Sequence, residues 1–177
     1  MDVKKSLHDK LRILNSETKE IYSLLNDLSE ENLHDTTYGW SIIQVMSHLN
    51  MAEAGSLQYM KKKMQAGDQM KDSGVLNSLR LFFSKYFMQS NIKWKAPAVV
   101  ANPKGDYSYE EIKKTWSQTR ENVEQYINDF PEKFLSKEVM KHPLAGRLTI
   151  GGTLDSFIFH QRHHVHQIKR IRKEIGI

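Results

Sequence analysis

Histidine is concentrated in one short stretch near the C-terminal end of the sequence. Residues 159–170 read FHQRHHVHQIKR and hold four of the eight histidines in the chain. The chain contains no cysteine, so disulfides and thiolate metal sites are excluded. A transition-metal site would therefore have to use imidazole and carboxylate ligands, which makes the histidines the first candidates for chemistry.

A helical wheel separates the four histidines into two pairs. Residues 154–175 show the periodicity of an amphipathic helix, at about 100° per residue. His164 lies about 45° from the centre of the apolar arc of this helix, and His160 lies about 85° from it. His163 and His166 point about 145° and 155° from that centre, which predicts a surface or interface position. The inward pair is spaced i, i+4, so its two imidazoles can share one metal ion.

A third ligand is required, because zinc sites normally have three or four protein ligands. His48 lies inside the second predicted helix, and the residues that share its seam are small or modest in size: Ser41, Val45, Ala52 and Gly55. Helices with such facing residues can approach each other closely, so this seam would bring His48 near His160 and His164. The alternative is that these histidines are hydrogen-bonded core residues with a structural role.

Helical periodicity dominates the rest of the chain. The long segments expected to be helical are residues 3–28, 41–67, 108–129 and 154–175. Ser41 with Gln44, and Ser108 with Glu111, have the spacing of capping boxes at the starts of two of these helices. A shorter helix is expected within residues 75–89, and no coherent run of strands is expected. The chain is thus predicted to be all-α, a four-helix bundle with an extra short helix in one connection.

Composition and charge exclude several classes of protein. With 177 residues, 39% of them hydrophobic, residues 1–177 are expected to form a single domain with one core. No apolar run approaches the roughly 18 residues that span a bilayer, and no signal-peptide pattern is present, so a cytoplasmic location without a membrane partner is expected. The net charge of +5 is spread along the chain. Basic runs at 61–63 and 169–173 are better explained as helix-end cations than as a nucleic-acid site.

Three further polar residues are candidates to support a site. Glu53 and Gln161 fall near the middle of the apolar arcs of their helices, where each needs a partner, and they could contact each other. A buried structural hydrogen bond is favoured over a general-base role for Glu53, because it points well away from His48. Gln167, three residues after His164, is either a surface glutamine or a residue that orients a ligand.

Three stretches of the sequence resemble the DinB-like superfamily, and most closely its YfiT-like metal-dependent hydrolases. They are WSIIQVMSHL at the start of one helix, KHPLAGRLT in a loop, and HQRHHVHQI in the last helix. The resemblance covers nearly the whole chain. It implies a four-helix bundle, commonly a homodimer, that binds a divalent metal such as zinc or nickel through three histidines, which match His48, His160 and His164. Gln167 matches an HxxQ ending that is frequent in the family.

Three imidazoles leave a coordination position open on the ion, as in catalytic rather than structural metal sites. A water there would have its pKa lowered to about 7, and a thiol would be deprotonated. The resemblance therefore implies a metal-dependent enzyme with a small-molecule substrate, either a hydrolase or an S-transferase that uses a low-molecular-weight thiol such as bacillithiol. The alternatives are a metal-binding or stress-response module without turnover, and a helical bundle whose dimer face is its function.

Two other side chains in these stretches receive simpler interpretations. His142, in the HP loop, is explained by loop packing. Phe159 lies about 175° from the core centre of its helix, so it is expected to be an exposed aromatic that needs cover from a partner chain or a flanking loop. The resemblance favours a homodimer, because members of this family are commonly homodimers.

Overall fold

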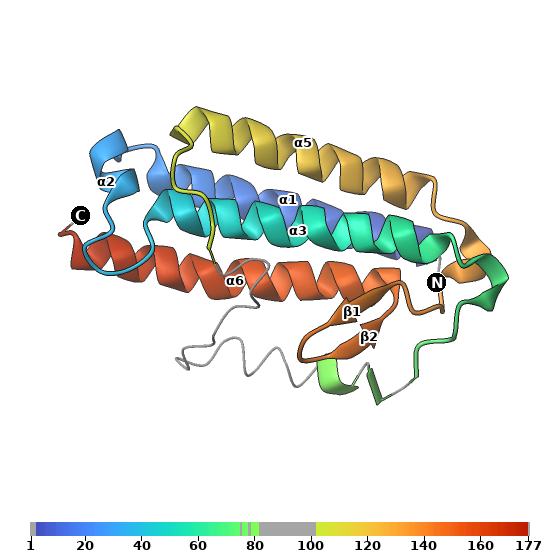
Figure 1. The fold of residues 1–177 in the computed structure, drawn as a ribbon. Helices are drawn as coiled ribbons and strands as arrows, with labels where there is room; N and C mark the ends of the chain where they lie inside the picture. The colour runs from blue at the N-terminus through green and yellow to red at the C-terminus, as the bar shows by residue number, and fades with distance from the viewer. Residues whose placement is uncertain (1–2, 75, 78, 82–101, 177) are drawn as a thin grey trace.

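Four long helices form the body of the molecule (Figure 1). The computed structural model describes residues 3–74, 76–77, 79–81 and 102–176. The long helices are α1 (Val3–Leu25), α3 (Ile42–Met64), α5 (Tyr109–Asn128) and α6 (Ile150–Glu174). The predicted all-α four-helix bundle is therefore confirmed, with each helix within a few residues of its expected position.

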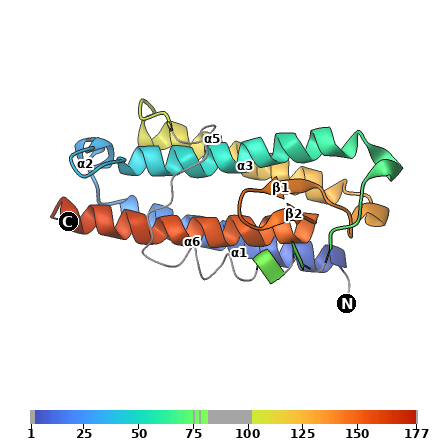
Figure 2. The ribbon, with the colours of Figure 1, turned by 60° about the horizontal axis from the view of Figure 1, so that its bottom comes forward.

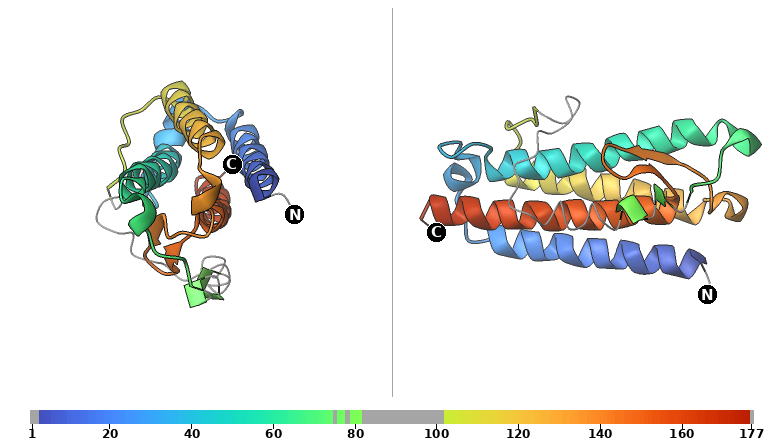
Figure 3. Two further views of the ribbon diagram at one scale, coloured as in Figure 1. Left: turned by 90° about the vertical axis from the view of Figure 1, so that its right-hand side faces the viewer. Right: turned by 90° about the horizontal axis from the view of Figure 1, so that it is seen from below.

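The helices are arranged so that parallel neighbours lie side by side. In the bundle α6 contacts α1 and α3, and α5 contacts the same two helices. Figures 1 and 3 show that α1 and α6 run in one direction, whereas α3 and α5 run in the other. The end of α3 and the start of α5 therefore lie at opposite ends of the bundle. As a result, α3 and α6 are antiparallel neighbours that face each other across the interior.

Side-chain caps define where the helices begin. Both predicted capping boxes are present: Ser41 accepts the Gln44 amide at the start of α3, and Ser108 accepts the Glu111 amide at the start of α5. In each box the N3 side chain bonds back to the backbone amide of the capping serine. These reciprocal bonds satisfy donors that a helix start would otherwise leave unpaired.

Helix α6 begins four residues earlier than the sequence predicts. The predicted start was Leu154, whereas the helix begins at Ile150 with Thr149 as its N-cap. The Thr149 hydroxyl accepts the amide of Gly152. Two consecutive glycines are poor helix formers and hid this first turn, but the cap is favourable enough to extend the helix through them.

Several short elements lie outside the four long helices. They are α2 (Glu30–His34), 3-10 helices at Gly67–Gln69 and Glu132–Phe134, and the strands β1 (Met140–His142) and β2 (Gly146–Leu148). The sequence predicts no coherent run of strands, and the antiparallel β1–β2 hairpin adds one pair of three-residue strands, which are too short to show an alternating pattern. The helix expected within residues 75–89 lies mostly outside the described residues, of which 76, 77 and 79–81 are helical.

The interior contains two apolar clusters with buried polar residues between them along the bundle axis. Along α1, Leu14 belongs to one cluster and Ile21 to the other, and Thr18 lies between them. Along α5, Val123 and Trp116 flank Arg120 in the same way. We call these buried polar residues the polar layer: Thr18, Glu53, Arg120, Gln161 and His164. His48 is also buried, but along α3 it lies next to Leu49, within the second cluster.

Phe159 departs from its expected exposure. It is half-buried and packs against the apolar cluster that contains Leu154 and Phe157. Its position therefore gives no support for a homodimer, because the cover that the aromatic ring needs comes at least in part from this chain.

Helix length and polarity also bear on membrane insertion. Among the helices that the structure describes, none combines the length and the apolar character needed to cross a bilayer.

Candidate metal centre

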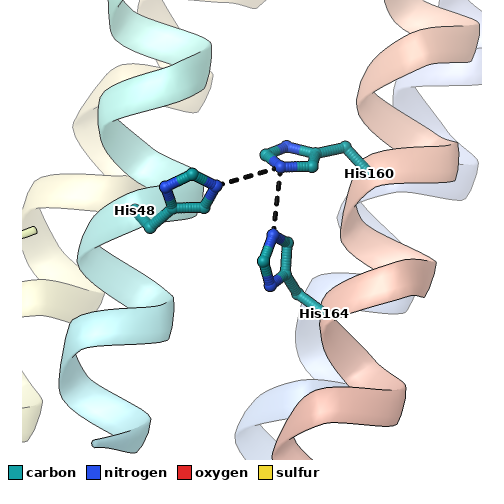
Figure 4. Close-up of side chains that lie close together, drawn as sticks. All are labelled: His48, His160 and His164. Carbon is teal, nitrogen blue, oxygen red and sulfur yellow. Dashed lines mark hydrogen bonds between the residues drawn. The ribbon is translucent and has the colours of Figure 1, made fainter. Parts of the chain in front are cut away.

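Three histidines from two helices converge beside the polar layer (Figure 4). His48 projects from α3, and His160 and His164 project from α6. The Nε2 atom of His160 lies 3.1 Å from Nε2 of His48 and 3.0 Å from Nε2 of His164. Within the described part of the chain, this is the one group of three or more histidine, aspartate and glutamate side chains that could hold a metal ion.

Helix geometry explains why these rings meet. His160 and His164 are one turn apart on α6, so both face the neighbouring helix α3. His48 lies in the second turn of α3 and is only 4% exposed, with the Trp40 ring 5.0 Å from its own ring. The wheel analysis predicted this convergence, and the structure brings the same three residues together.

The hydrogen bond between His164 and Gln167 determines which ring nitrogen of His164 presents its lone pair to the cluster. Nδ1 of His164 lies 2.7 Å from Oε1 of Gln167, an atom that can only accept a hydrogen bond. In the neutral ring Nδ1 therefore carries the proton and donates it to Gln167, which leaves the Nε2 lone pair directed at the other two histidines. This is the tautomer that a metal-ligating histidine requires.

The three Nε2 atoms are crowded in a way that suits a cation. Because Nε2 of His164 carries no proton, its contact with His160 needs a proton on Nε2 of His160. The contact between His160 and His48 then has to share that same proton between two acceptors. A metal ion at the centre would instead accept all three lone pairs, and neutral imidazoles suit zinc, nickel, copper and iron. The residues present therefore fit a divalent transition metal.

Burial keeps the rings of His160 and His164 neutral in the folded chain. Loss of solvent lowers the pKa of His164 to about 3, and the charge of His48 adds to this effect. Loss of solvent also lowers the pKa of His160 well below its ordinary value, and the charges of His164 and His48 act in the same direction. Metal ions bind the unprotonated ring, so the site is ready to bind at neutral pH.

The metal-free protein is expected to lose stability as the pH falls. An unfolded histidine titrates near pH 6.5, whereas folded His160 and His164 stay neutral to a much lower pH. The unfolded state therefore binds more protons below pH 6.5, and the stability present at higher pH is lost progressively toward pH 3. Urea denaturation with a chelator should show about 2–3 kcal/mol less unfolding free energy at about pH 5.5 than at about pH 7.5.

A double variant, His160→Gln with His164→Gln, provides the control for this measurement. Glutamine does not titrate, so most of the pH dependence should disappear even if the variant is less stable overall. Equal unfolding free energies for the parent protein at the two pH values would contradict the neutral, buried state of these rings.

Glu53 and Gln161, the two other candidates for supporting the site, form hydrogen bonds with different residues. Both Glu53 oxygens accept hydrogen bonds from Arg120, at 2.8 and 3.1 Å, and neither accepts one from Gln161. Gln161 instead donates to the Leu14 carbonyl and accepts from the Thr18 hydroxyl. Neither residue has a hydrogen bond to the three histidines, so the structure gives both a role in packing the bundle.

Arg120 is the residue in this region that the sequence analysis missed. Besides Glu53, its guanidinium donates to Oδ1 of Asn15 at 3.0 Å and reaches the Thr18 hydroxyl at 3.5 Å. Burial raises the pKa of Glu53, and the adjacent positive charge of Arg120 opposes that rise. The available signal was the place of Arg120 on the apolar stripe of its helix, where it would need a buried acidic partner.

A fourth histidine lies at the end of strand β1. Nδ1 of His142 accepts the backbone amides of Leu144 and Ala145, at 3.2 and 3.0 Å, and so closes the tip of the hairpin. These bonds agree with the prediction that loop packing accounts for His142. Burial lowers the pKa of His142, and its charge acts on the pKa of His160.

Comparisons with known proteins agree with the fold and identify the family. A family model described as the DinB superfamily matches residues 14–168. The Bacillus subtilis (strain 168) protein YuaE, described as uncharacterized, is 24% identical over 167 residues, covering 93% of this chain and 98% of that protein. The structure of YfiT from Bacillus subtilis, described as a probable metal-dependent hydrolase with an unusual four-helix bundle topology, matches with a TM-score of 0.54. That match has 12% identity and covers 96% of this chain and 87% of the other, so it shows a shared fold.

Proposed function

Since this chain belongs to the DinB superfamily, we propose that it is a metal-dependent hydrolase whose ion is held by His48, His160 and His164. The observation that carries the proposal is the convergence of three Nε2 atoms, with at least one lone pair held inward by Gln167. The description of YfiT as a probable metal-dependent hydrolase supports the same reaction class. Zinc or nickel is the proposed metal, because the resemblance to the DinB-like superfamily implies one of these two and both accept three imidazole ligands.

The residues of this chain would prepare the site in three ways. Burial keeps His160 and His164 neutral, Gln167 fixes the tautomer and orientation of His164, and the Trp40 ring packs beside His48. When bound, a divalent ion with three imidazole ligands acts as a Lewis acid and activates water or a thiol at its open position. The substrate is proposed to be a small molecule with an ester, amide or phosphoester bond.

Transfer to a small thiol is a second use of the same site. The chain has no cysteine, so a thiol nucleophile would have to arrive as a cosubstrate of low molecular weight. Such a reaction would need the same three histidines and the same open position on the metal. The two reactions differ only in the nucleophile, and a direct assay separates them.

The proposal is tested with protein purified without an affinity tag that binds metals. We expect about one zinc or nickel per chain by elemental analysis. We also expect metal-dependent release of nitrophenol from p-nitrophenyl acetate or bis-p-nitrophenyl phosphate. A chelator should abolish this release, and added zinc or nickel should restore it, whereas the His164→Ala variant should stay inactive.

Other outcomes of the assay are equally informative. Consumption of 1-chloro-2,4-dinitrobenzene only when a small thiol is added would identify the S-transferase instead. Metal binding without turnover of either kind of substrate would favour a binding module. Absence of metal from the purified protein, with none taken up at neutral pH, would overturn the proposal altogether.

A further inference from the structure

A groove lies on the outside of the bundle between α1 and α5. Helix α1 packs mainly along α6 (Figure 2) and α5 packs mainly on α3, so α1 and α5 contact each other less than either contacts its main neighbour. The groove has a volume of about 450 Å³, within the size range of small-molecule sites. None of the three clustered histidines lines it, so it is separate from the candidate metal centre.

One face of α1 supplies most of the polar side chains in the groove. Arg12, Asn15, Ser16 and Lys19 line it and follow one another at helical spacing. Among the described residues, the Ser16 hydroxyl and the Lys19 ammonium group have no hydrogen-bond or ion-pair partner. Arg12 donates to Asp9 through Nη2 at 2.8 Å, and this exposed pair uses one of its five N–H groups. The α1 wall therefore offers several hydrogen-bond donors to a ligand.

Asn15 connects the groove to the polar layer. Nη1 of Arg120 lies 3.0 Å from Oδ1 of Asn15, and because arginine can only donate, the amide atom that faces it must be the oxygen. The Nδ2 group of Asn15 then has two N–H bonds for which no partner is found in the part of the chain that the structure describes. Asn15 is half-buried and lines the groove, so a ligand there is a suitable acceptor for its amide.

The spacing of these donors fits a group with several oxygen atoms. Asn15, Ser16 and Lys19 lie within about 6 Å along the helix axis, so their side chains can reach one phosphate or carboxylate group. Arg12 is one turn away and can reach the same group or a second one. The buried side chain of Leu11 adds an apolar surface for the remainder of a ligand.

The charges of the groove favour an anion. Arg12 and Lys19 contribute two positive charges and Glu124, on the α5 side, contributes one negative charge, which leaves a net charge of +1. All three side chains are exposed, so their charges are partly screened by water. Glu124 repels an anion, whereas the two cations and the neutral donors attract it.

We propose that the groove between α1 and α5 binds a small organic anion. Its phosphate or carboxylate group accepts hydrogen bonds from the Asn15 amide, the Ser16 hydroxyl and the Lys19 ammonium group, and its apolar part lies against Leu11. This second site does not depend on the proposed function, because no metal ligand takes part in it. A bound anion would also join a chain of hydrogen bonds that runs through Asn15 and Arg120 to Glu53.

The test is a titration followed by nuclear magnetic resonance of the ¹⁵N-labelled protein. Inorganic phosphate is one probe and succinate is a second, so that the two kinds of anionic group are compared directly. We expect the side-chain NH₂ signals of Asn15 to shift and reach saturation with at least one of them. Because these signals belong to a group inside the groove, they report binding there rather than elsewhere on the surface.

Two variants should change the affinity in opposite directions. Lys19→Gln removes an attractive charge and should raise the Kd for the anion about fivefold. Glu124→Gln removes a repulsive charge and should lower the Kd about threefold. Both residues are exposed, so the fold should be preserved, and a loss of structure could not produce a tighter site.

A matched control places the same charge change outside the groove. Lys169 is exposed on α6, so Lys169→Gln should leave the Kd unchanged, and so should the metal-site variant His164→Ala. Absence of any Asn15 shift with both anions would overturn the proposal. It would also fail if Lys19→Gln bound the anion as the parent does, or if His164→Ala abolished binding, because the anion would then bind at another site. Each of these results leaves the elemental analysis of the metal centre to be judged on its own.

Discussion

Replacing His164 with alanine is expected to weaken divalent-metal binding by at least about a hundredfold. Loss of a hydrogen-bond partner of a ligand usually costs 10- to 100-fold in affinity, and loss of the ligand itself should cost more. The remaining pair, His48 and His160, would provide only two imidazoles. Calorimetric titration of the metal-free protein with zinc or nickel measures the effect, and His48→Ala should behave in the same way.

Two neighbouring residues on α6 provide graded controls for this series. His166 is exposed and lies two residues from His164, so His166→Ala should leave the metal affinity unchanged. Gln167→Leu removes the acceptor for Nδ1 of His164 and should give an intermediate loss, about 10- to 100-fold. One equivalent of metal bound with parental affinity by His164→Ala would contradict the assignment of this residue as a ligand.

Replacing Arg120 with methionine is expected to lower the unfolding free energy by about 3–5 kcal/mol at neutral pH. Methionine keeps much of the volume of the side chain but removes the charge that lies against Glu53. The carboxylate, only 2% exposed, would then have lost both hydrogen bonds that Arg120 donates to it. Urea denaturation monitored by circular dichroism gives the free energy directly.

A second substitution distinguishes loss of the ion pair from loss of packing. In the double variant Arg120→Met with Glu53→Gln, no buried charge remains unpaired, so we expect part of the lost stability to return. If the double variant is no more stable than Arg120→Met, the loss came from packing. If Arg120→Met alone costs less than about 1 kcal/mol, the ion pair behaves like an exposed one and the prediction is wrong.

Information local to one helix was sufficient to predict most of the fold and the convergence of the three histidines. The periodicity of each segment identified the long helices, and two capping boxes gave the starts of α3 and α5. The inward direction of His160 and His164 follows from their own helix, and the small residues beside His48 indicated which seam would approach them. That the three bind a metal stays a proposal.

Contacts between distant segments could not be predicted in this way. Glu53 was recognised as a buried carboxylate, but its partner Arg120 lies on a helix 67 residues away, and nothing in the sequence links the two. The hairpin was missed because each strand has only three residues, which is too short for a pattern of period two. The tautomer of His142 depends on backbone amides in the turn of that same hairpin.

The polar layer also limits how the helices can slide past one another. Burial of apolar side chains is favourable without regard to direction, so apolar clusters alone discriminate less sharply between alignments that differ by one helical turn, about 5.4 Å. Such a shift would move Glu53 or Arg120 into an apolar cluster and leave a charge without its partner, at a cost of several kcal/mol. Residues in the middle of the bundle therefore select a single alignment of α3 against α5. The same alignment fixes the position of α3 along the bundle axis. It therefore also fixes the level along that axis at which His48 meets the two histidines of α6.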